Sequence, residues 1–326
     1  NISTQKTPST APQETLLPQW GLILVEGPDA ASLLQNQLTN SVLGLKTHKA
    51  GGIAFSPQSA KLIGYCTPKG RLMASAWIGL FPGDDGADNR YSLFISRDIA
   101  LSTAKRLSMY ILRSKVTVKD VSDDWDIFGC YGDSLVLNSK SIALGLPEMQ
   151  FNSATMTRTL IARPKQAEGS LESSDPSTLE QWNSLEVLSG IPRIVLATQE
   201  QFVPQMINFE SVHGVDFKKG CYPGQEIVAR SQYRGAVKRR LHIAHTLLDD
   251  FSLAHSQPGV EIFHSSDGQQ PAGMVVLASP NPQDPNRIDL QIECKLDAIE
   301  HGEIYLGQNN GPVLKVDSLP YPLLEI

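Results

Sequence analysis

One cysteine in this sequence stands where a thiol could do chemistry. The stretch KKGCYPGQEIVAR, residues 218–230, places Cys221 between two glycines and shortly after two lysines. Pro223 has a backbone angle suited to a first helical turn, so the pattern predicts a helix that begins beside the cysteine and ends near Gly235. A helix N-terminus and adjacent lysines both favour the thiolate, the form that attacks electrophiles and binds metals. We therefore interpret Cys221 as a functional thiol rather than a buried filler residue.

The other three cysteines have different settings. Cys66, Cys130 and Cys294 lie in apolar or alternating stretches, and every cysteine is more than sixty residues from the next. Because no C-x-x-C pair is present, the pattern excludes a local zinc or four-cysteine cluster site and favours a reducing, cytoplasmic compartment. We expect these three cysteines to be structural.

Charge is distributed unevenly along the chain. The net charge is −6, yet residues 218–240 contain seven basic residues and one acid, a net +6 that leaves −12 for the remainder. A basic segment in an acidic protein is typical of an anion site, but it is also typical of a solvated strand face. The sequence leaves both interpretations open.

Length and composition indicate a globular protein of two or three domains. The chain has 326 residues, of which 41% are hydrophobic and 19% charged. No apolar run approaches the roughly 18 residues of a membrane span, so no membrane association is expected. The first 15 residues are polar and rich in Pro and Thr, which predicts a disordered tail rather than a signal peptide.

Apolar periodicity predicts two mixed groups of strands and helices, followed by an all-β part. A strand is expected in WGLILVEG and a helix in PDAASLLQNQLTNSV; a second helix is expected in RDIALSTAKRLSMYILR. A further helix, TLEQWNSLEVLSG, should have Thr178 as its N-cap and Gly190 as its stop. Beyond Gly235 the pattern consists of short strands and turns, with no helix expected before residue 295.

The motif around Cys221 also carries a family resemblance. The sequence K-G-C-Y-x-G-Q-E resembles the defining motif of the YgfZ-type folate-binding proteins, relatives of the glycine-cleavage T-protein that include mitochondrial iron–sulfur assembly factors. Further matches occur in the family's order, in GPDAASLLQNQLTNSV, LRSKVTVKD, SGIPRI, FVPQMINFE and LPYPL. The resemblance covers nearly the whole chain from about Leu16.

This resemblance implies an α+β fold of three domains arranged as a cloverleaf ring. The first α+β domain would span 16–125, with 190–235 returning to it; the second would span 126–189, and a C-terminal β-barrel would span 236–326. A folate, tetrahydrofolate or a derivative, would bind at the central opening.

The resemblance also implies the residues that bind the folate. Trp20 and Trp182 match family tryptophans that line its site, and a flat pterin gains about 0.5–1.5 kcal/mol from an aromatic contact beyond the area that it buries. The motif would add further cofactor-binding residues, namely Lys219, Tyr222, Gln225, Glu226 and Arg230.

The sequence departs from the enzyme relative at its acidic positions. T-proteins carry an aspartate pair where this chain has Ala74 and Ser75, and a glutamate where it has Leu188. The nearest acid, Glu186, is expected on a different helix face. A general acid or base must lie within hydrogen-bond reach of the proton it moves, so we expect no aminomethyl transfer. Asn36 likewise stands where the family prefers glycine.

Three functions compete at this stage. The leading one is a folate-dependent accessory protein that supports iron–sulfur cluster maintenance and thereby tRNA-modifying enzymes that carry clusters. Cys221 would share a transient cluster with ligands from elsewhere, because such clusters need about four protein ligands. The alternative is a tetrahydrofolate-dependent one-carbon transferase with Cys221 as nucleophile or acceptor; His213, eight residues upstream, is interpreted as a surface loop residue rather than a base. Direct tRNA binding through residues 218–240 is the third; it would depend steeply on salt.

Overall fold

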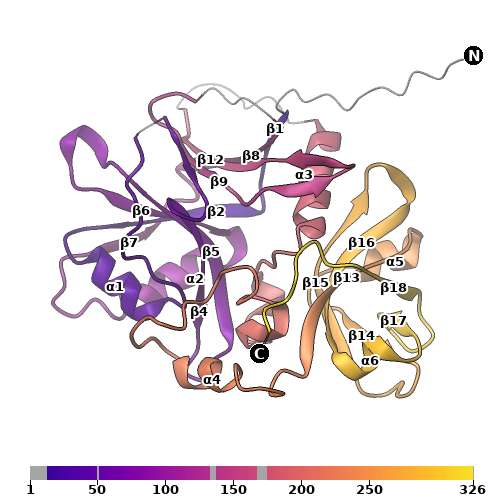
Figure 1. Cartoon of the computed structure of the whole chain (residues 1–326). Helices are drawn as coiled ribbons and strands as arrows, with labels where there is room; N and C mark the ends of the chain where they lie inside the picture. Colours follow the sequence, from indigo (N-terminus) through magenta and orange to yellow (C-terminus); the bar gives the residue numbers. More distant parts are fainter. Residues whose placement is uncertain (1–12, 50, 133–136, 167–174, 326) are drawn as a thin grey trace, which may run out of the picture.

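Two β-sheets packed face to face and a separate β-barrel make up the structure (Figure 1). The computed structural model describes residues 13–49, 51–132, 137–166 and 175–325. The two sheets and the helix between sheets and barrel share one continuous apolar core, while the barrel has a core of its own. The predicted α+β class with a C-terminal barrel is confirmed.

The first sheet is antiparallel throughout, in the order β4-β5-β6-β2-β7. Its strands are β2 (Trp20–Glu26), β4 (Ala60–Cys66), β5 (Leu72–Phe81), β6 (Arg90–Ser96) and β7 (Thr117–Asp120). Its helices are α1 (Ala30–Gln37) and α2 (Arg97–Ser108), with a short 3-10 turn at Asp84–Gly86. Strands β2 and β6 are almost wholly buried, because one face meets helix α2 and the other meets the second sheet.

The second sheet has the order β1-β8-β12-β9-β3, and only the β9-β3 pair is parallel. Its strands are β1 (Gln13–Leu16), β3 (Ile53–Phe55), β8 (Trp125–Tyr131), β9 (Ile142–Gly145) and β12 (Arg158–Pro164), and a small hairpin joins β10 (Met149–Phe151) to β11 (Ala154–Met156). Two of these strands come from the N-terminal part of the chain. The second sheet is therefore not built from residues 126–189 alone.

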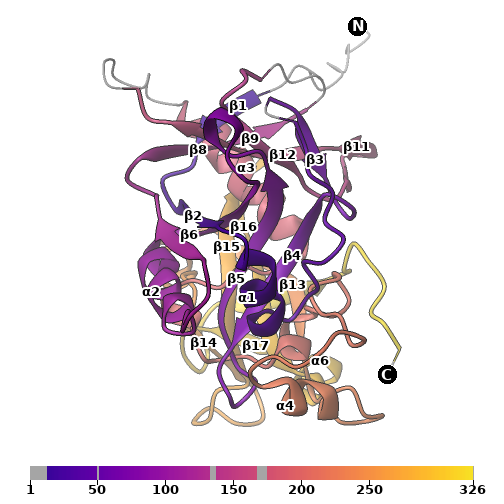
Figure 2. The ribbon, with the colours of Figure 1, turned by 90° about the vertical axis from the view of Figure 1, so that its left-hand side faces the viewer.

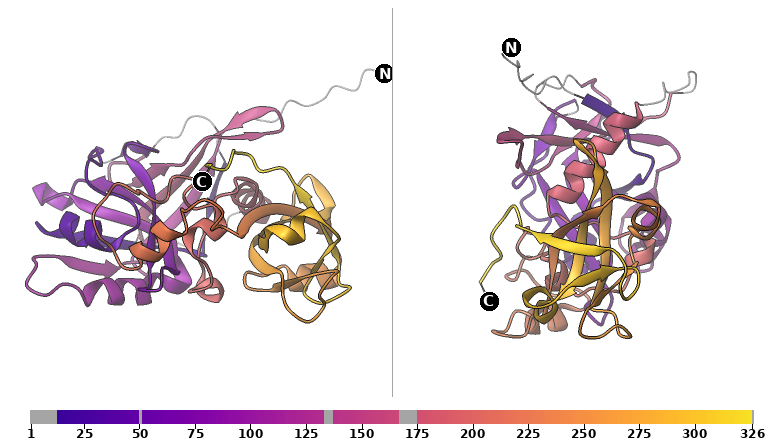
Figure 3. Two further views of the ribbon diagram at one scale, coloured as in Figure 1. Left: turned by 60° about the horizontal axis from the view of Figure 1, so that its bottom comes forward. Right: turned by 90° about the vertical axis from the view of Figure 1, so that its right-hand side faces the viewer.

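The barrel is closed by six strands in the order β13-β16-β15-β14-β17-β18. These are β13 (Arg239–Leu247), β14 (Glu261–His264), β15 (Gly273–Asn281), β16 (Asp284–Lys295), β17 (Ile304–Leu306) and β18 (Val313–Asp317), with helices α5 (Asp250–His255) and α6 (Leu296–Glu300). Helix α3 (Pro176–Leu188) packs on β1 and β8 of the second sheet and on β15 and β16 of the barrel. Figure 2 shows the first sheet with the barrel behind it, and Figure 3 shows the barrel from its outer side.

The chain between α3 and the barrel runs back along the first sheet. Leu72 exchanges backbone hydrogen bonds with this segment at Phe202 and Glu200, and the Thr39 hydroxyl donates to the Gly214 carbonyl at 2.7 Å. Two 3-10 turns (Leu196–Thr198 and Pro204–Ile207) and α4 (Gln225–Arg230) lie in this return. The segment therefore joins all three parts of the molecule.

Several predicted element ends differ in the structure. Residues 13–15 belong to strand β1, so the predicted tail extends too far; residues 1–12 lie outside the described part. Helix α3 begins two residues before Thr178, because the carboxylate of Asp175 caps it by accepting from the Ser177 amide at 3.0 Å. Helix α5, which has its own Asp249–Ser252 capping box, was missed.

Candidate ligand site at the domain junction and the Cys221 loop

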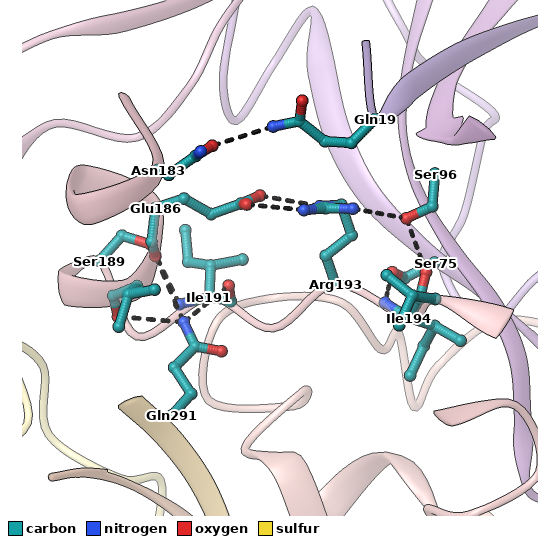
Figure 4. A network of polar contacts seen from close by, with 12 residues as sticks. Gln19, Ser75, Ser96, Asn183, Glu186, Ser189, Ile191, Arg193, Ile194 and Gln291 are labelled. Atoms are coloured by element: carbon teal, nitrogen blue, oxygen red, sulfur yellow. Dashed lines mark hydrogen bonds and ion pairs between the residues drawn. The ribbon is translucent and has the colours of Figure 1, made fainter. Parts of the chain in front are cut away.

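A buried polar network connects the three parts of the molecule where they meet (Figure 4). Ser75 of β5 and Ser96 of β6 come from the first sheet, Glu186 from α3 and Gln291 from β16 of the barrel. The Gln291 amide nitrogen donates to three carbonyls around the end of α3, at 3.1–3.3 Å. Because a buried amide with several partners fixes its neighbours, this contact ties the barrel to the helix.

An ion pair lies at the centre of this network. Nε and Nη2 of Arg193 donate to the two carboxylate oxygens of Glu186, both at 3.0 Å, and Nη1 donates to the Ser96 hydroxyl at 2.9 Å. Each of the paired residues is 8% exposed. A bidentate pair of this geometry is among the strongest charge-assisted contacts in proteins. Glu186 therefore faces the junction, on a different face of α3 from Leu188, which lines neither of the cavities described below.

Trp20, the first residue of β2, lies against this ion pair. The Arg193 guanidinium carbon is 4.9 Å from the centre of the indole ring, a cation–π contact. The indole is 3% exposed, and its Nε1 has no hydrogen-bond partner among the residues that the structure describes. A buried indole N–H normally finds a partner, so this donor is free for a ligand or a water molecule.

Two cavities meet at the Glu186–Arg193 pair. An inner cavity of about 10 Å³, lined by Trp20, Ser75 and Arg158, has room for about one water molecule. An outer cleft of about 540 Å³ has Gln19, Asn183 and the barrel residue Leu277 in its wall. Both cavities have Glu186 and Arg193 in their walls, so the pair separates them.

A second guanidinium lies beside the pair without a carboxylate of its own. Arg158, at the start of β12, is 3% exposed; its Nε has no hydrogen-bond partner, and among the described residues no carboxylate forms an ion pair with it. Burial lowers the pKa of Arg158 to about 10, while the nearby Glu186 acts to raise it. It stays charged at neutral pH, so the described residues in the wall of the inner cavity include two cations and one anion.

Trp182 lies one layer farther from the cavities. Its ring is fully buried and packs so tightly on Gly129 that a Cβ there would come within 2.5 Å of the indole. The Arg158 guanidinium carbon is 5.9 Å from the ring centre, between the indole and the junction. That Trp182 contacts a folate stays a prediction; in this structure the ring supports Arg158.

The positions of the enzyme relative's acids lie at this junction or beside it. Ser75 lines the inner cavity, and its hydroxyl accepts from the Ile194 amide at 3.0 Å, whereas Ala74 is buried in the core. Leu188, at the last turn of α3, is not among the residues that line either cavity. Among the described residues that line the two cavities, the carboxylates are those of Glu186, which is bound to Arg193, and of Asp98 in the outer cleft, which accepts from the Leu196 amide.

The Cys221 loop lies at a different place, against the turn between β4 and β5. Gly224, with a φ of +78°, fits so closely that a Cβ there would lie 2.4 Å from the Thr67 carbonyl oxygen. Helix α4 begins at Gln225 and ends at Arg230, so Pro223 precedes it and Gly235 does not terminate it. Cys221 is exposed.

The remaining cysteines are buried, as expected for structural residues. Burial raises the pKa of Cys66 and of Cys294 to about 12, and that of Cys130 to about 11. Among the four, only Cys221 is open to a reagent or a partner.

The Lys219 side chain stabilises the Cys221 loop by joining it to helix α1. Its ammonium donates to the carbonyls of Gln35 and Leu38, at 2.6 and 2.8 Å, and so caps the C-terminal end of α1. It also lies 4.5 Å from the centre of the Tyr222 ring. Burial lowers its pKa to about 8, an effect that Asp216 and Cys221 oppose.

The other predicted motif residues have local partners too. Tyr222 is buried, which raises its pKa, and the Gln225 amide nitrogen donates to the carbonyls of Lys219 and Gly220. Glu226 and Arg230 form an exposed pair one helical turn apart. None of the five lines the two junction cavities, so the structure does not bring them together with Trp20; a role in cofactor binding stays a prediction for them.

Much of the basic segment is neutralised inside the fold. Arg240 pairs with Glu210, whose side chain is fully buried, at 2.6 Å, and Arg239 pairs with Glu293 at 2.8 Å. The members that are exposed and form no ion pair with any described residue are Lys218, Arg234 and Lys238. The sequence could not reveal these internal partners, which lie 30 and 54 residues away. The anion surface is therefore smaller than the charge count indicates.

Within the described ranges, no three His, Cys, Asp or Glu side chains are grouped so that they could hold a metal ion. A resident iron–sulfur cluster does not fit these residues, because Cys221 has no second thiol beside it. No described helix is long and apolar enough to cross a membrane.

Comparison of the sequence with known proteins finds relatives that share one name. No family model matches the chain. Proteins named "tRNA-modifying protein YgfZ" are similar to it: the one from Pectobacterium carotovorum is 30% identical over 71% of this chain and 70% of its own length, and the one from Photobacterium profundum is 32% identical over 70% and 68%. The one from Enterobacter sp. is 26% identical over 95% of this chain and 93% of its own.

A solved structure is similar in fold. The glycine cleavage system aminomethyltransferase T from Bartonella henselae superposes with a TM-score of 0.61 over 96% of this chain and 87% of its own, at 12% identity. The TM-score supports a common fold, and at this low sequence identity nothing follows about a common reaction.

Proposed function

Because the chain belongs to the YgfZ family, we propose that it is a folate-binding accessory protein that supports tRNA modification. The relatives' name carries the tRNA link. The observation that supports the folate is the junction itself, where an indole ring, a buried carboxylate and unpartnered donors meet beside a cleft of about 540 Å³. Small-molecule sites generally occupy about 300–1,000 Å³ and combine an apolar wall with a few polar groups.

The residues present fit a tetrahydrofolate on the condition that the Arg193 side chain moves off Trp20. The inner cavity is too small for a pterin in this structure, and one face of Trp20 is covered by Arg193. The outer cleft has the size that such a ligand needs. Trp20 would supply the aromatic face, and Glu186 and Arg158 the charges; a bound folate would supply its reduced pterin ring and its glutamate carboxylates.

The role in tRNA modification would depend on Cys221. Its thiol is exposed on a loop that Lys219 and the close fit of Gly224 hold in place. Iron–sulfur enzymes that modify tRNA are the proposed partners, with the cluster as cargo and the cytoplasm as compartment. A single thiol can supply one ligand to a cluster, and a partner would supply the others.

Aminomethyl transfer is not part of the proposed function. Ala74, Ser75 and Leu188 offer no carboxylate, and Glu186 is already engaged by two nitrogens of Arg193. We expect no glycine-cleavage turnover when this protein is the only T-component with a lipoyl carrier protein. Measurable turnover would favour the one-carbon transferase instead.

Complementation of a strain that lacks the protein tests the proposed function. Modified nucleosides in total tRNA should return to normal with the wild-type chain, and should stay low with Cys221→Ser. The matched control, Cys130→Ser, alters a buried thiol and should complement. Full complementation by Cys221→Ser would contradict the role of the thiol, and unchanged tRNA in the deletion strain would contradict the role in tRNA modification.

Two measurements on purified protein test the small molecules. Tetrahydrofolate should quench tryptophan fluorescence in the wild type, and Trp20→Ala should weaken the binding. The absorbance spectrum of natively purified protein should contain a pterin signal and no resident iron–sulfur band. Unchanged affinity in Trp20→Ala would exclude the junction as the site.

A further inference from the structure

The Arg193 side chain is bound as a small planar ligand would be. Its guanidinium lies over the Trp20 ring at 4.9 Å, and two of its nitrogens donate side by side to the Glu186 carboxylate at 3.0 Å. Both charged residues are 8% exposed, and the pair separates the inner cavity from the outer cleft. The geometry thus defines a site for a flat group with two adjacent donors on one edge.

A pterin presents this pattern. Its pyrimidine ring contains a guanidine unit, in which the ring N3–H and the 2-amino group lie side by side in the ring plane. We propose that Glu186 and Trp20 form the recognition site for the pterin edge of the ligand, and that Arg193 occupies this site until the ligand replaces it. The inference rests on the proposed function, since it names the residues that recognise the pterin ring of the folate.

The backbone around Arg193 allows such an exchange. Glu186 is fixed on α3, whereas Arg193 lies in the connection after Gly190, outside any helix or strand. The backbone of the adjacent Ile194 is held by two hydrogen bonds: its amide donates to the Ser75 hydroxyl, and its carbonyl accepts from the Ser96 hydroxyl. The side chain can therefore move while the main chain stays in place. Its departure would open the inner cavity to the outer cleft.

The second guanidinium explains how Glu186 stays charged during the exchange. When Arg193 leaves, the carboxylate would otherwise be buried beside a neutral pterin without a cation, which is costly. Arg158 lies close enough to interact with Glu186 electrostatically and has no carboxylate partner among the described residues. It supplies the balancing charge in both states.

An internal competitor weakens the ligand's apparent affinity. The site is free only in the fraction of molecules in which Arg193 has left Glu186, and apparent affinity falls by that fraction. Removing the competitor should therefore strengthen binding, whereas removing a residue of ordinary structural importance should weaken it or leave it unchanged. The direction of the effect tests the proposal.

The experiment measures tetrahydrofolate binding by calorimetry to the wild type, Arg193→Met, Glu186→Gln and the control Arg97→Met. The Arg97 side chain contacts Ser122 and Asp123, and Arg97 lines neither junction cavity. We expect Arg193→Met to bind about tenfold more tightly or better, Glu186→Gln to lose at least about tenfold, and the control to match the wild type. Pterin should compete, whereas lumazine, which has a 2-oxo group in place of the 2-amino group, should not.

The outcomes separate this inference from the proposed function. Tetrahydrofolate binding to the wild type with equal or weaker binding to a folded Arg193→Met refutes the exchange and leaves folate binding intact. Binding to Arg193→Met alone supports the exchange. If Glu186→Gln does not fold, the comparison of pterin with lumazine as competitors on the wild type tests whether Glu186 recognises the 2-amino edge. Equal competition by the two compounds refutes that recognition. Absence of binding to every variant refutes both proposals.

Discussion

Alkylation with iodoacetamide at pH 8 should separate the four cysteines by rate, with Cys221 first. Thiolate is the reacting form, and a thiol of pKa about 12, such as Cys66 or Cys294, is only ~10⁻⁴ ionised at pH 8. Cys130, with a pKa of about 11, is ~10⁻³ ionised. As a reference, a cysteine in an unstructured peptide has a pKa of about 8.5 and is roughly one quarter ionised at this pH.

These fractions must be corrected for reactivity. A more basic thiolate is a better nucleophile, by ~10-fold for Cys130 and ~40-fold for Cys66 and Cys294, so the difference in rate from the reference cysteine falls to ~25-fold and ~60-fold respectively. Burial then adds to it, because the three sulfurs lie in residues that are 3%, 1% and 0% exposed and need local opening before a reagent reaches them.

Peptide mass spectrometry against time provides the rates. The native protein should lose Cys221 thiol at least about 20-fold faster than any other, whereas all four should react at similar rates in concentrated urea. Alkylation of a second cysteine in the native protein at the rate of Cys221 would refute the assignment of Cys221 as the accessible thiol.

Further predictions concern stability. Gly224→Ala should lower the free energy of unfolding more than Gly235→Ala: both positions have a positive φ, a cost of about 1–2 kcal/mol for an L-residue, but only Gly224 lacks space for a Cβ. Arg240→Met should cost about 3–5 kcal/mol in urea unfolding, because it leaves Glu210 buried without its cation, and a cost below about 1 kcal/mol would contradict this. Burial, with a smaller contribution from Arg240, lowers the pKa of His242 to about 4, from about 6.5 for an exposed histidine. The unfolded chain therefore binds the proton first, so stability should fall as the pH drops from about 6.5 to about 4, and His242→Gln should remove this slope.

The sequence predicted the fold class well because its evidence extended along the chain. Apolar periodicity located β2, α1, α2 and α3, and the short strand patterns separated by turns after Gly235 indicated the barrel. The composition of the second sheet could not be predicted, since β1 and β3 join it through pairings with strands more than eighty residues away. Such pairings leave no local pattern.

The junction shows what the sequence could and could not give. Glu186 lies one helical turn after Trp182, so the two share a face of α3, and counting from Trp182 would have placed the carboxylate correctly. Arg193 was within a matched motif but had no property that marked it. Arg158 has no local sequence signal, because its significance depends on its burial without a carboxylate partner among the described residues, which only the packed structure reveals.

The crystal structure of the protein with bound tetrahydrofolate tests the central claim most directly. It should show the pterin ring against Trp20, its 2-amino edge on the carboxylate of Glu186, and the Arg193 side chain turned away from both. Density for the folate elsewhere would contradict the account, for example in the cavity of about 910 Å³ beside His245 and Arg287 on the barrel. An intact Glu186–Arg193 pair beneath a bound ligand would contradict it equally.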